Sequence, residues 1–188
     1  SQRLYEQIGD ELGAARVKWS LITVVPGDHP NPKSKAGLID LLARFERNGD
    51  TWYACQTMMS LAWVEIESGD FPAATRWFVR AFQTSYALRD VTGTTIAIPL
   101  AALMAIEAGR PEDAARLMGA SEHLCELYGV KAPLGLSQLL HNSNPASISE
   151  VMLGKERYGE AFAEGSQMTL DEAVALAVGI QEEAWGPG

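Results

Sequence analysis

The apolar residues that follow Asp50 recur every three or four positions, which is the spacing of one face of an α-helix. This apolar stripe consists of Trp52, Cys55, Met59, Ala62 and Ile66. Asp50 can accept hydrogen bonds from the free N–H groups of the first turn, and Gly69 can adopt the left-handed conformation that ends a helix. A second helix is therefore expected from Asp70 to near Leu88. Its inward face consists of Ala74, Phe78, Ala81 and Phe82.

The two-helix pattern recurs with a period of 40 residues, which is the signature of a repeat protein. The markers of the period are Gly9-Asp10, Gly49-Asp50 and Arg89-Asp90, together with Gly69-Asp70 and Gly109-Arg110. The first unit is expected to contain helices over 11–24 and 34–47, and the third unit helices over 91–108 and 111–128. Pro99 lies in the middle of one of these helices, where its missing N–H is expected to produce a kink.

The repeat stops after residue 129. Residues 130–148 are rich in helix breakers and are expected to form an irregular linker with one turn at 137–141. Capping-box patterns then predict two further helices, over 149–164 and 169–185. The predicted organisation is a repeat region over 1–129, a linker over 130–148 and a helical cap over 149–188.

The first residues of the chain resemble the end of a helix whose beginning is absent. Leu4, Tyr5 and Ile8 have helical spacing but no capping residue before them. We therefore expect the chain to be a piece of a longer protein. The exposed end of the repeats would then be frayed or would dock on another copy, which allows a homodimer.

The composition narrows the class of protein. The chain has 188 residues, 47% of them apolar, and a formal net charge of −9. The negative charge argues against direct binding to nucleic acid, which requires a basic surface. No apolar run reaches the roughly 20 residues of a membrane span, and no signal peptide is present. Two cysteines cannot form a disulfide framework, so we expect a cytoplasmic protein.

No catalytic motif is found in the sequence. Phosphate-binding loops, the Gly-x-Ser-x-Gly nucleophile motif and the His-Glu-x-x-His metal motif are all absent. His123 and Cys125 would point to different sides of a helix and cannot share a metal. Glu122 and Glu126 share one face, where they are expected to be solvated. The chain is therefore not expected to be an enzyme or to bind a cofactor or metal.

One region resembles a tetratricopeptide repeat. The matching residues are Leu61, Ala62, Gly69-Asp70-Phe71, Ala74, Phe78 and Ala81. The period of 40 exceeds the 34 residues of the plain repeat, and in this it is similar to the lengthened repeats in the C-terminal regions of LuxR-type and maltose-regulator-like bacterial transcriptional activators. Residues 111–122 and 154–174 also resemble segments of that family, whereas 130–148 and Pro99 depart from it.

The resemblance implies an all-α, right-handed superhelical solenoid of antiparallel helix pairs with two C-terminal capping helices. It also implies a regulatory module of a larger signal-transduction ATPase, whose ATPase and DNA-binding domains lie outside this sequence. Two functions remain open. The favoured one is a non-catalytic module that binds a protein or peptide segment, including one from the parent protein. The alternative is a sensor that binds a small-molecule effector inside the superhelix.

The first helix of each pair lines the concave face of a tetratricopeptide solenoid, which assigns a candidate partner-binding surface by register. Its members are Arg16, Trp19, Gln56, Met59, Trp63, Glu67, Ile96, Leu103 and Glu107. The apolar members would form a groove and the polar members its rim, a combination typical of partner sites. A second outcome stays open, in which the superhelix is tight and the apolar side chains pack on each other or under the C-terminal helices.

Overall fold

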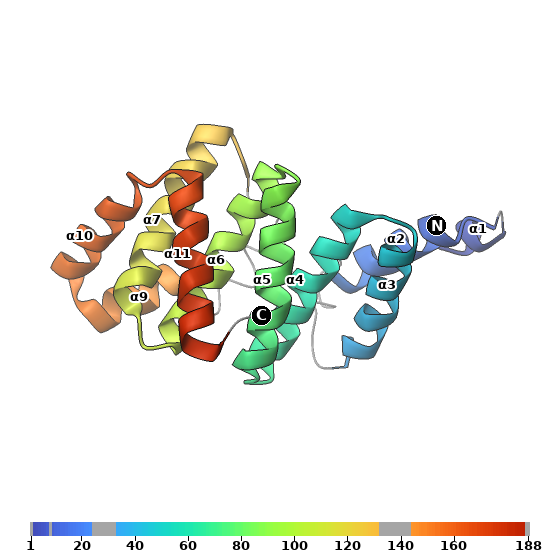
Figure 1. Ribbon diagram of the computed structural model, residues 1–188, viewed down its shortest axis with the longest axis horizontal. Coiled ribbons are helices and arrows are strands. Elements are labelled where there is room, and N and C mark those ends of the chain that lie inside the picture. Colours follow the sequence, from blue (N-terminus) through green and yellow to red (C-terminus); the bar gives the residue numbers. More distant parts are fainter. Residues whose placement is uncertain (1, 8, 24–32, 132–143, 187–188) are drawn as a thin grey trace. The chain divides into compact units, whose positions relative to one another are not determined.

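The computed structural model describes residues 2–7, 9–23, 33–131 and 144–186, and within these ranges every regular element is an α-helix (Figure 1). The predicted all-α class is therefore confirmed. The expected turn at 137–141 lies outside the described residues. No helix among the described residues is both long enough and apolar enough to cross a lipid bilayer. The chain divides into two compact units, residues 1–85 and 86–188.

Unit 1 contains five helices in its described part, and their bounds follow the repeat. They are α1 (Gln2–Gln7), α2 (Glu11–Thr23), α3 (Lys35–Arg47), α4 (Thr51–Glu67) and α5 (Phe71–Ala87), the last of which extends two residues beyond the unit. The core of the unit combines apolar side chains from four of them. It includes Ala15 of α2, Leu38 and Phe45 of α3, Met58 and Leu61 of α4 and Ala81 of α5.

Unit 2 contains two helices of the repeat and three that follow it. They are α6 (Val91–Glu107), α7 (Pro111–Tyr128), α9 (Pro145–Leu153), α10 (Lys155–Gly165) and α11 (Leu170–Trp185). Pro99 is buried inside α6, which continues on both sides of it. The predicted start of α11 is confirmed, because Thr169 and Glu172 form both hydrogen bonds of a capping box.

The single helix predicted over 149–164 was wrong, because the structure has two helices there. Gly154 separates them with φ +80° and ψ 158°, a conformation that side chains beyond glycine rarely adopt. The first of the two begins at Pro145, earlier than expected and inside the segment predicted to be irregular. Asn144 caps it by accepting a hydrogen bond of 3.0 Å from the Ala146 N–H.

The repeat is visible in the backbone as a left-handed residue every 20 positions. Gly49, Gly69, Gly109 and Gly129 have φ between +64° and +76°, and Arg89 occupies the same position with φ +56°. Aspartates follow three of these residues and cap the next helix. Asp50, Asp70 and Asp90 each accept a hydrogen bond from the N–H three residues later, at 3.5, 3.0 and 2.9 Å. The predicted helix stop at Gly69 and the predicted cap at Asp50 are both confirmed.

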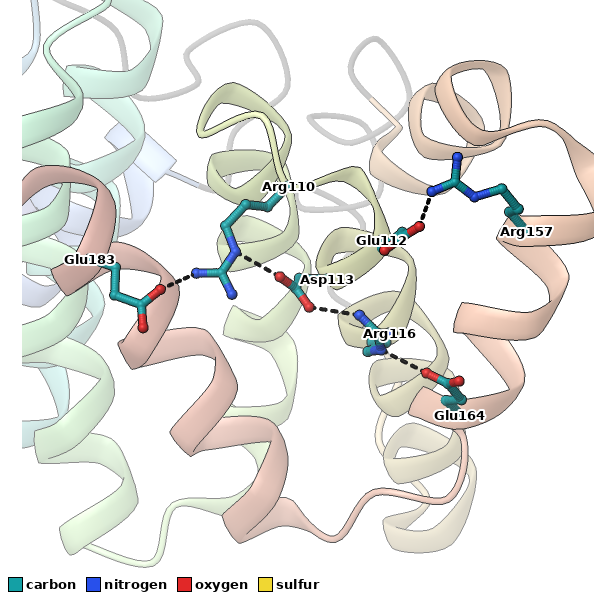
Figure 2. Close-up of polar contacts among 7 residues, drawn as sticks. All are labelled: Arg110, Glu112, Asp113, Arg116, Arg157, Glu164 and Glu183. Atoms are coloured by element: carbon teal, nitrogen blue, oxygen red, sulfur yellow. Dashed lines mark hydrogen bonds and ion pairs between the residues drawn. The ribbon is translucent and has the colours of Figure 1, made fainter.

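Arg110 stands where the repeat would place a capping aspartate, and it makes no cap bond. Its guanidinium instead joins an ion-pair network that connects α7 with α10 and α11, as Figure 2 shows. Arg110 pairs with Asp113 at 2.7 Å and with Glu183 at 2.6 Å. Arg116 pairs with the same Asp113 at 2.9 Å and with Glu164 at 2.8 Å.

The backbones of α7 and α10 approach each other closely beneath this network. A Cβ atom added to Gly165 would lie 2.6 Å from the carbonyl carbon of Arg116 and 2.7 Å from its Cα. A Cβ added to Gly119 would lie 3.0 Å from the carbonyl carbon of Phe162. Both glycines are therefore required for this helix crossing. A further ion pair, between Arg157 of α10 and Glu112 of α7, links the same two helices (Figure 2).

Candidate functional site

The nine predicted partner-binding residues are divided between the two units. Arg16, Trp19, Gln56, Met59, Trp63 and Glu67 belong to unit 1, and Ile96, Leu103 and Glu107 belong to unit 2. Arg16, Glu67 and Glu107 are exposed, whereas Trp19, Gln56, Met59 and Ile96 are half-buried.

Two of the predicted residues do not offer the open apolar surface expected of them. Trp63 is only 8% exposed and Leu103 only 6%. The reason is that α4 and α6 are covered around most of their circumference. Even the carboxyl-bearing side chain of Glu65 in α4 is only 2% exposed, and α6 is buried at every residue from Ala97 to Ile106. A pattern at helical spacing cannot distinguish such a helix from one with a free face.

The accessible candidate surface of unit 1 is an aromatic cluster formed by α2 and α4. Trp19, Trp52 and Tyr53 contact one another edge to face. Their ring centroids are separated by 6.4 Å for Trp19 and Trp52, 5.4 Å for Trp19 and Tyr53, and 4.9 Å for Trp52 and Tyr53. Edge-to-face packing is the favoured geometry for aromatic pairs. Phe45 of α3 supports Tyr53 from the core, at 5.2 Å between centroids.

Trp52 is the functional residue that sequence reasoning missed. The sequence placed it on the inward face of its helix, but 46% of the residue is exposed. Trp52 is the second residue of α4, in the first turn, where a neighbouring helix covers a side chain less completely. Its position at a helix end was the one signal in the sequence that could have indicated exposure.

Arg16 is held in a fixed position at the edge of this cluster. Its Nε and terminal nitrogen both lie 2.8 Å from Oδ2 of Asp50, and its guanidinium carbon lies 5.3 Å from the centroid of the Tyr53 ring. The hydrogen bond to Asp50 raises the pKa of Arg16 above its ordinary value, although partial burial opposes the shift. Asp50 also caps α4, so one carboxylate fixes both the start of the helix and the arginine.

The half-buried residues of the surface extend it along α4. Trp52, Gln56 and Met59 follow one another at intervals of four and three residues, so they share one face of the helix. Met59 and Trp19 also pack against the core of unit 1. The Nε1 atom of Trp19 is buried and makes no hydrogen bond with the described part of the protein. We refer to Arg16, Trp19, Trp52, Tyr53, Gln56 and Met59 as the aromatic surface.

The groups that might support catalysis are not arranged for it. Glu65 forms an ion pair with Lys35, whose Nζ lies 2.7 Å from Oε1, and this neutralises the buried carboxylate. Burial raises the pKa of the Cys125 thiol, which disfavours the nucleophilic thiolate, although a hydrogen bond with Ser121 opposes the shift. Across the ranges that the structure describes, no three His, Cys, Asp or Glu side chains are grouped as metal ligands.

In comparisons with known proteins, the chain matches no family model, no curated protein and no solved structure.

Proposed function

We propose that this chain is a non-catalytic interaction and regulatory module whose aromatic surface binds a segment of a partner protein. The observation that carries the proposal is the exposed Trp52 ring, supported by Trp19 and Tyr53 and bordered by the Arg16–Asp50 ion pair. Tryptophan, tyrosine and arginine are the residue types most enriched where alanine substitution weakens protein binding most.

The rigidity of the surface favours binding. Trp19, Trp52 and Tyr53 restrain one another, and Asp50 restrains Arg16, so these side chains lose little conformational freedom when a partner arrives. The ion pair also satisfies both charges within the module. The expected partner segment therefore presents apolar side chains to the rings and need not supply a charge.

The wider setting of the proposal comes from the sequence. Helices that start every 20 residues support an arrangement of the tetratricopeptide kind, a right-handed solenoid of antiparallel helix pairs. The resemblance to LuxR-type regulators places the module in the C-terminal region of a larger bacterial ATP-dependent transcriptional regulator in the cytoplasm. Its partner would then be another domain of that regulator or a separate signalling protein.

A small-molecule effector is the second candidate. It is favoured by the indole N–H groups of Trp19 and Trp63, which are buried and make no hydrogen bond among the described residues. An effector with acceptor atoms could satisfy such donors, which are costly when left unpaired. A thermal-shift screen with metabolites tests this candidate. Stabilisation by a micromolar ligand that is lost in Trp19→Phe, which keeps an aromatic ring but removes the N–H, would favour it over a protein partner.

The experiment for the favoured function compares three immobilised baits: the unaltered protein, Trp52→Ala and Ile39→Ala. Ile39 is a matched control because it is 45% exposed but lies on α3, outside the aromatic surface. Proteins captured from a bacterial extract are identified by mass spectrometry, purified and titrated by calorimetry. Trp63 is unsuitable as a probe, because a buried tryptophan replaced by alanine destabilises the fold.

We expect a partner that binds the unaltered protein and Ile39→Ala with equal affinity. Loss of an exposed anchor of this type costs about 2 kcal/mol, so Trp52→Ala should weaken binding roughly 30-fold. Its circular dichroism and melting temperature should stay close to those of the unaltered protein. Equal binding to all three baits, or no reproducible partner for any of them, would refute the proposal.

A further inference from the structure

The outer face of α9 in unit 2 carries the most exposed large apolar side chain in the described part of the protein. Val151 is 85% exposed, and the adjacent Met152 is 52% exposed. Only Pro145 and Ser149 of this nine-residue helix are buried. The helix is therefore attached to unit 2 along a narrow strip and presents most of its circumference to the surroundings.

Two carboxylates lie beside this apolar face. Glu150 precedes Val151 in α9, and Glu122 belongs to α7, which packs against α9. Both charges act on the hydroxyl of Tyr158 in α10. Burial is the main cause of its raised pKa, and Glu150 and Glu122 raise it further. Glu122, Glu150 and Tyr158 are thus neighbours, although they come from three different helices.

Neither carboxylate is neutralised within the described part of the protein. In contrast, Glu112, Glu164 and Glu183 of the same unit each pair with an arginine (Figure 2). Residues 86–188 contain 14 acidic and six basic residues, a formal net charge of −8 out of the −9 of the whole chain. Unit 2 therefore carries nearly all of the negative charge, and the carboxylates beside α9 contribute to it without a counter-ion among the described residues.

We propose that the α9 face, made of Glu122, Glu150, Val151, Met152 and Tyr158, docks a basic amphipathic segment of another protein. Aliphatic side chains of that segment would cover Val151 and Met152, and lysine or arginine side chains would pair with Glu150 and Glu122. The charge complementarity selects this occupant over a neutral one. This site is separate from the aromatic surface and does not depend on it.

The same charges disfavour a second copy of the chain as the occupant. In a two-fold symmetric dimer through this face, each copy would present the same patch. Glu150 and Glu122 would then meet their own symmetry mates. Like charges brought together at an interface oppose association, whereas a basic segment removes the repulsion.

The test uses a fluorescein-labelled amphipathic helical peptide of leucine and lysine, titrated with the whole protein and followed by fluorescence anisotropy. A peptide with glutamate in place of every lysine is the charge control. One variant combines Glu122→Gln with Glu150→Gln, and a second combines Val151→Ser with Met152→Ser. The matched control combines Glu156→Gln with Glu160→Gln, which removes the same charge from exposed positions of α10 turned away from Tyr158.

We expect binding of the lysine peptide only. Loss of two paired charges or two apolar contacts at a docking surface costs about tenfold or more in affinity, so both α9-face variants should show at least that loss. The Glu156/Glu160 control should change affinity less than about twofold, because a distant exposed charge is screened by salt. Trp52→Ala should bind the peptide unchanged, which separates this site from the aromatic surface.

Three results would overturn the proposal. Absence of binding would exclude the site, and equal losses in both glutamate pairs would show that the peptide responds only to overall charge. Concentration-dependent dimerisation in sedimentation velocity, lost in the Val151/Met152 variant, would assign the face to a second copy. Failure of the aromatic-surface experiment has no bearing on any of these outcomes, because it probes unit 1.

Discussion

The close crossing of α7 and α10 makes a strong prediction for Gly165→Ala. The new Cβ would lie 2.6 Å from the carbonyl carbon of Arg116 and 2.7 Å from its Cα, whereas ordinary van der Waals distances for a Cβ begin at 3.4 Å. The two helices would have to separate by about 0.7 Å to bring the new Cβ and the Arg116 Cα to that distance. Both atoms of Arg116 belong to the backbone of a helix, so no side-chain rotation can relieve the overlap.

The size of the effect follows from a comparison with Gly159→Ala in the same helix. A Cβ at Gly159 meets nothing within 4 Å, so this variant should be more stable by about 0.5–1 kcal/mol because alanine favours the helix. Gly165→Ala gains a similar term but adds the overlap, which costs about 1–3 kcal/mol. The difference in unfolding free energy between the two variants is therefore about 1–3 kcal/mol in favour of Gly159→Ala.

Urea denaturation followed by circular dichroism measures both variants directly. For a chain of this length, the expected difference corresponds to a gap of roughly 2–12 °C between their melting temperatures. Equal stability of Gly165→Ala and Gly159→Ala would refute the close crossing. Hydrogen exchange offers a second readout, because faster exchange of the α10 amides in Gly165→Ala alone would locate the damage at this crossing.

Three further predictions concern the repeat and the C-terminal cap. Arg89→Gly should raise the unfolding free energy by about 0.5–1 kcal/mol, because relief of the left-handed strain exceeds the entropy cost of glycine; a lower melting temperature would contradict this. Phe78→Ala should cost about 3–5 kcal/mol by leaving a cavity, and Ala74→Leu about 1–3 kcal/mol by overfilling the core, since both residues are fully buried; unchanged urea midpoints would contradict the helix register. Hydrogen bonds from Thr169 lower the pKa of Glu172 below 4.5, so its contribution to stability is present above that pH and is lost as the pH falls through the lowered pKa. The stability difference between the unaltered protein and Glu172→Gln should therefore shrink in acid, and a difference that persists at low pH would contradict the assignment.

Sequence reasoning located the helices of the repeat because their ends depend on local backbone chemistry. A glycine at the left-handed position and an aspartate after it determine where one helix stops and the next begins, whatever lies around them. The helices over 51–67, 71–87, 91–107 and 111–128 therefore agree with prediction to within a residue or two. The extended conformation of Gly154 depends on how α9 and α10 pack on α7, and so the break there was missed.

The candidate site was harder to predict because exposure is a property of the surroundings. Trp52 and Trp63 lie on similar apolar spacing in one helix, yet the first is 46% exposed and the second 8%. Arg16 was assigned to the surface by register, but nothing in the sequence indicated its ion pair with Asp50, 34 residues away. The face of α9 combines residues of three helices that no short motif connects.

The return of α11 to α6 has a consequence for the newly made chain. The amide of Gln181 donates to the Ala101 carbonyl, 80 residues earlier, and Arg110 pairs with Glu183, 73 residues later. At a translation rate of 5–20 residues per second, α6 waits roughly 4–16 s for this helix to be synthesised. During that interval the apolar side of α6 that α11 covers is open to water. This fragment of the protein is therefore where a ribosome-associated chaperone would be needed first.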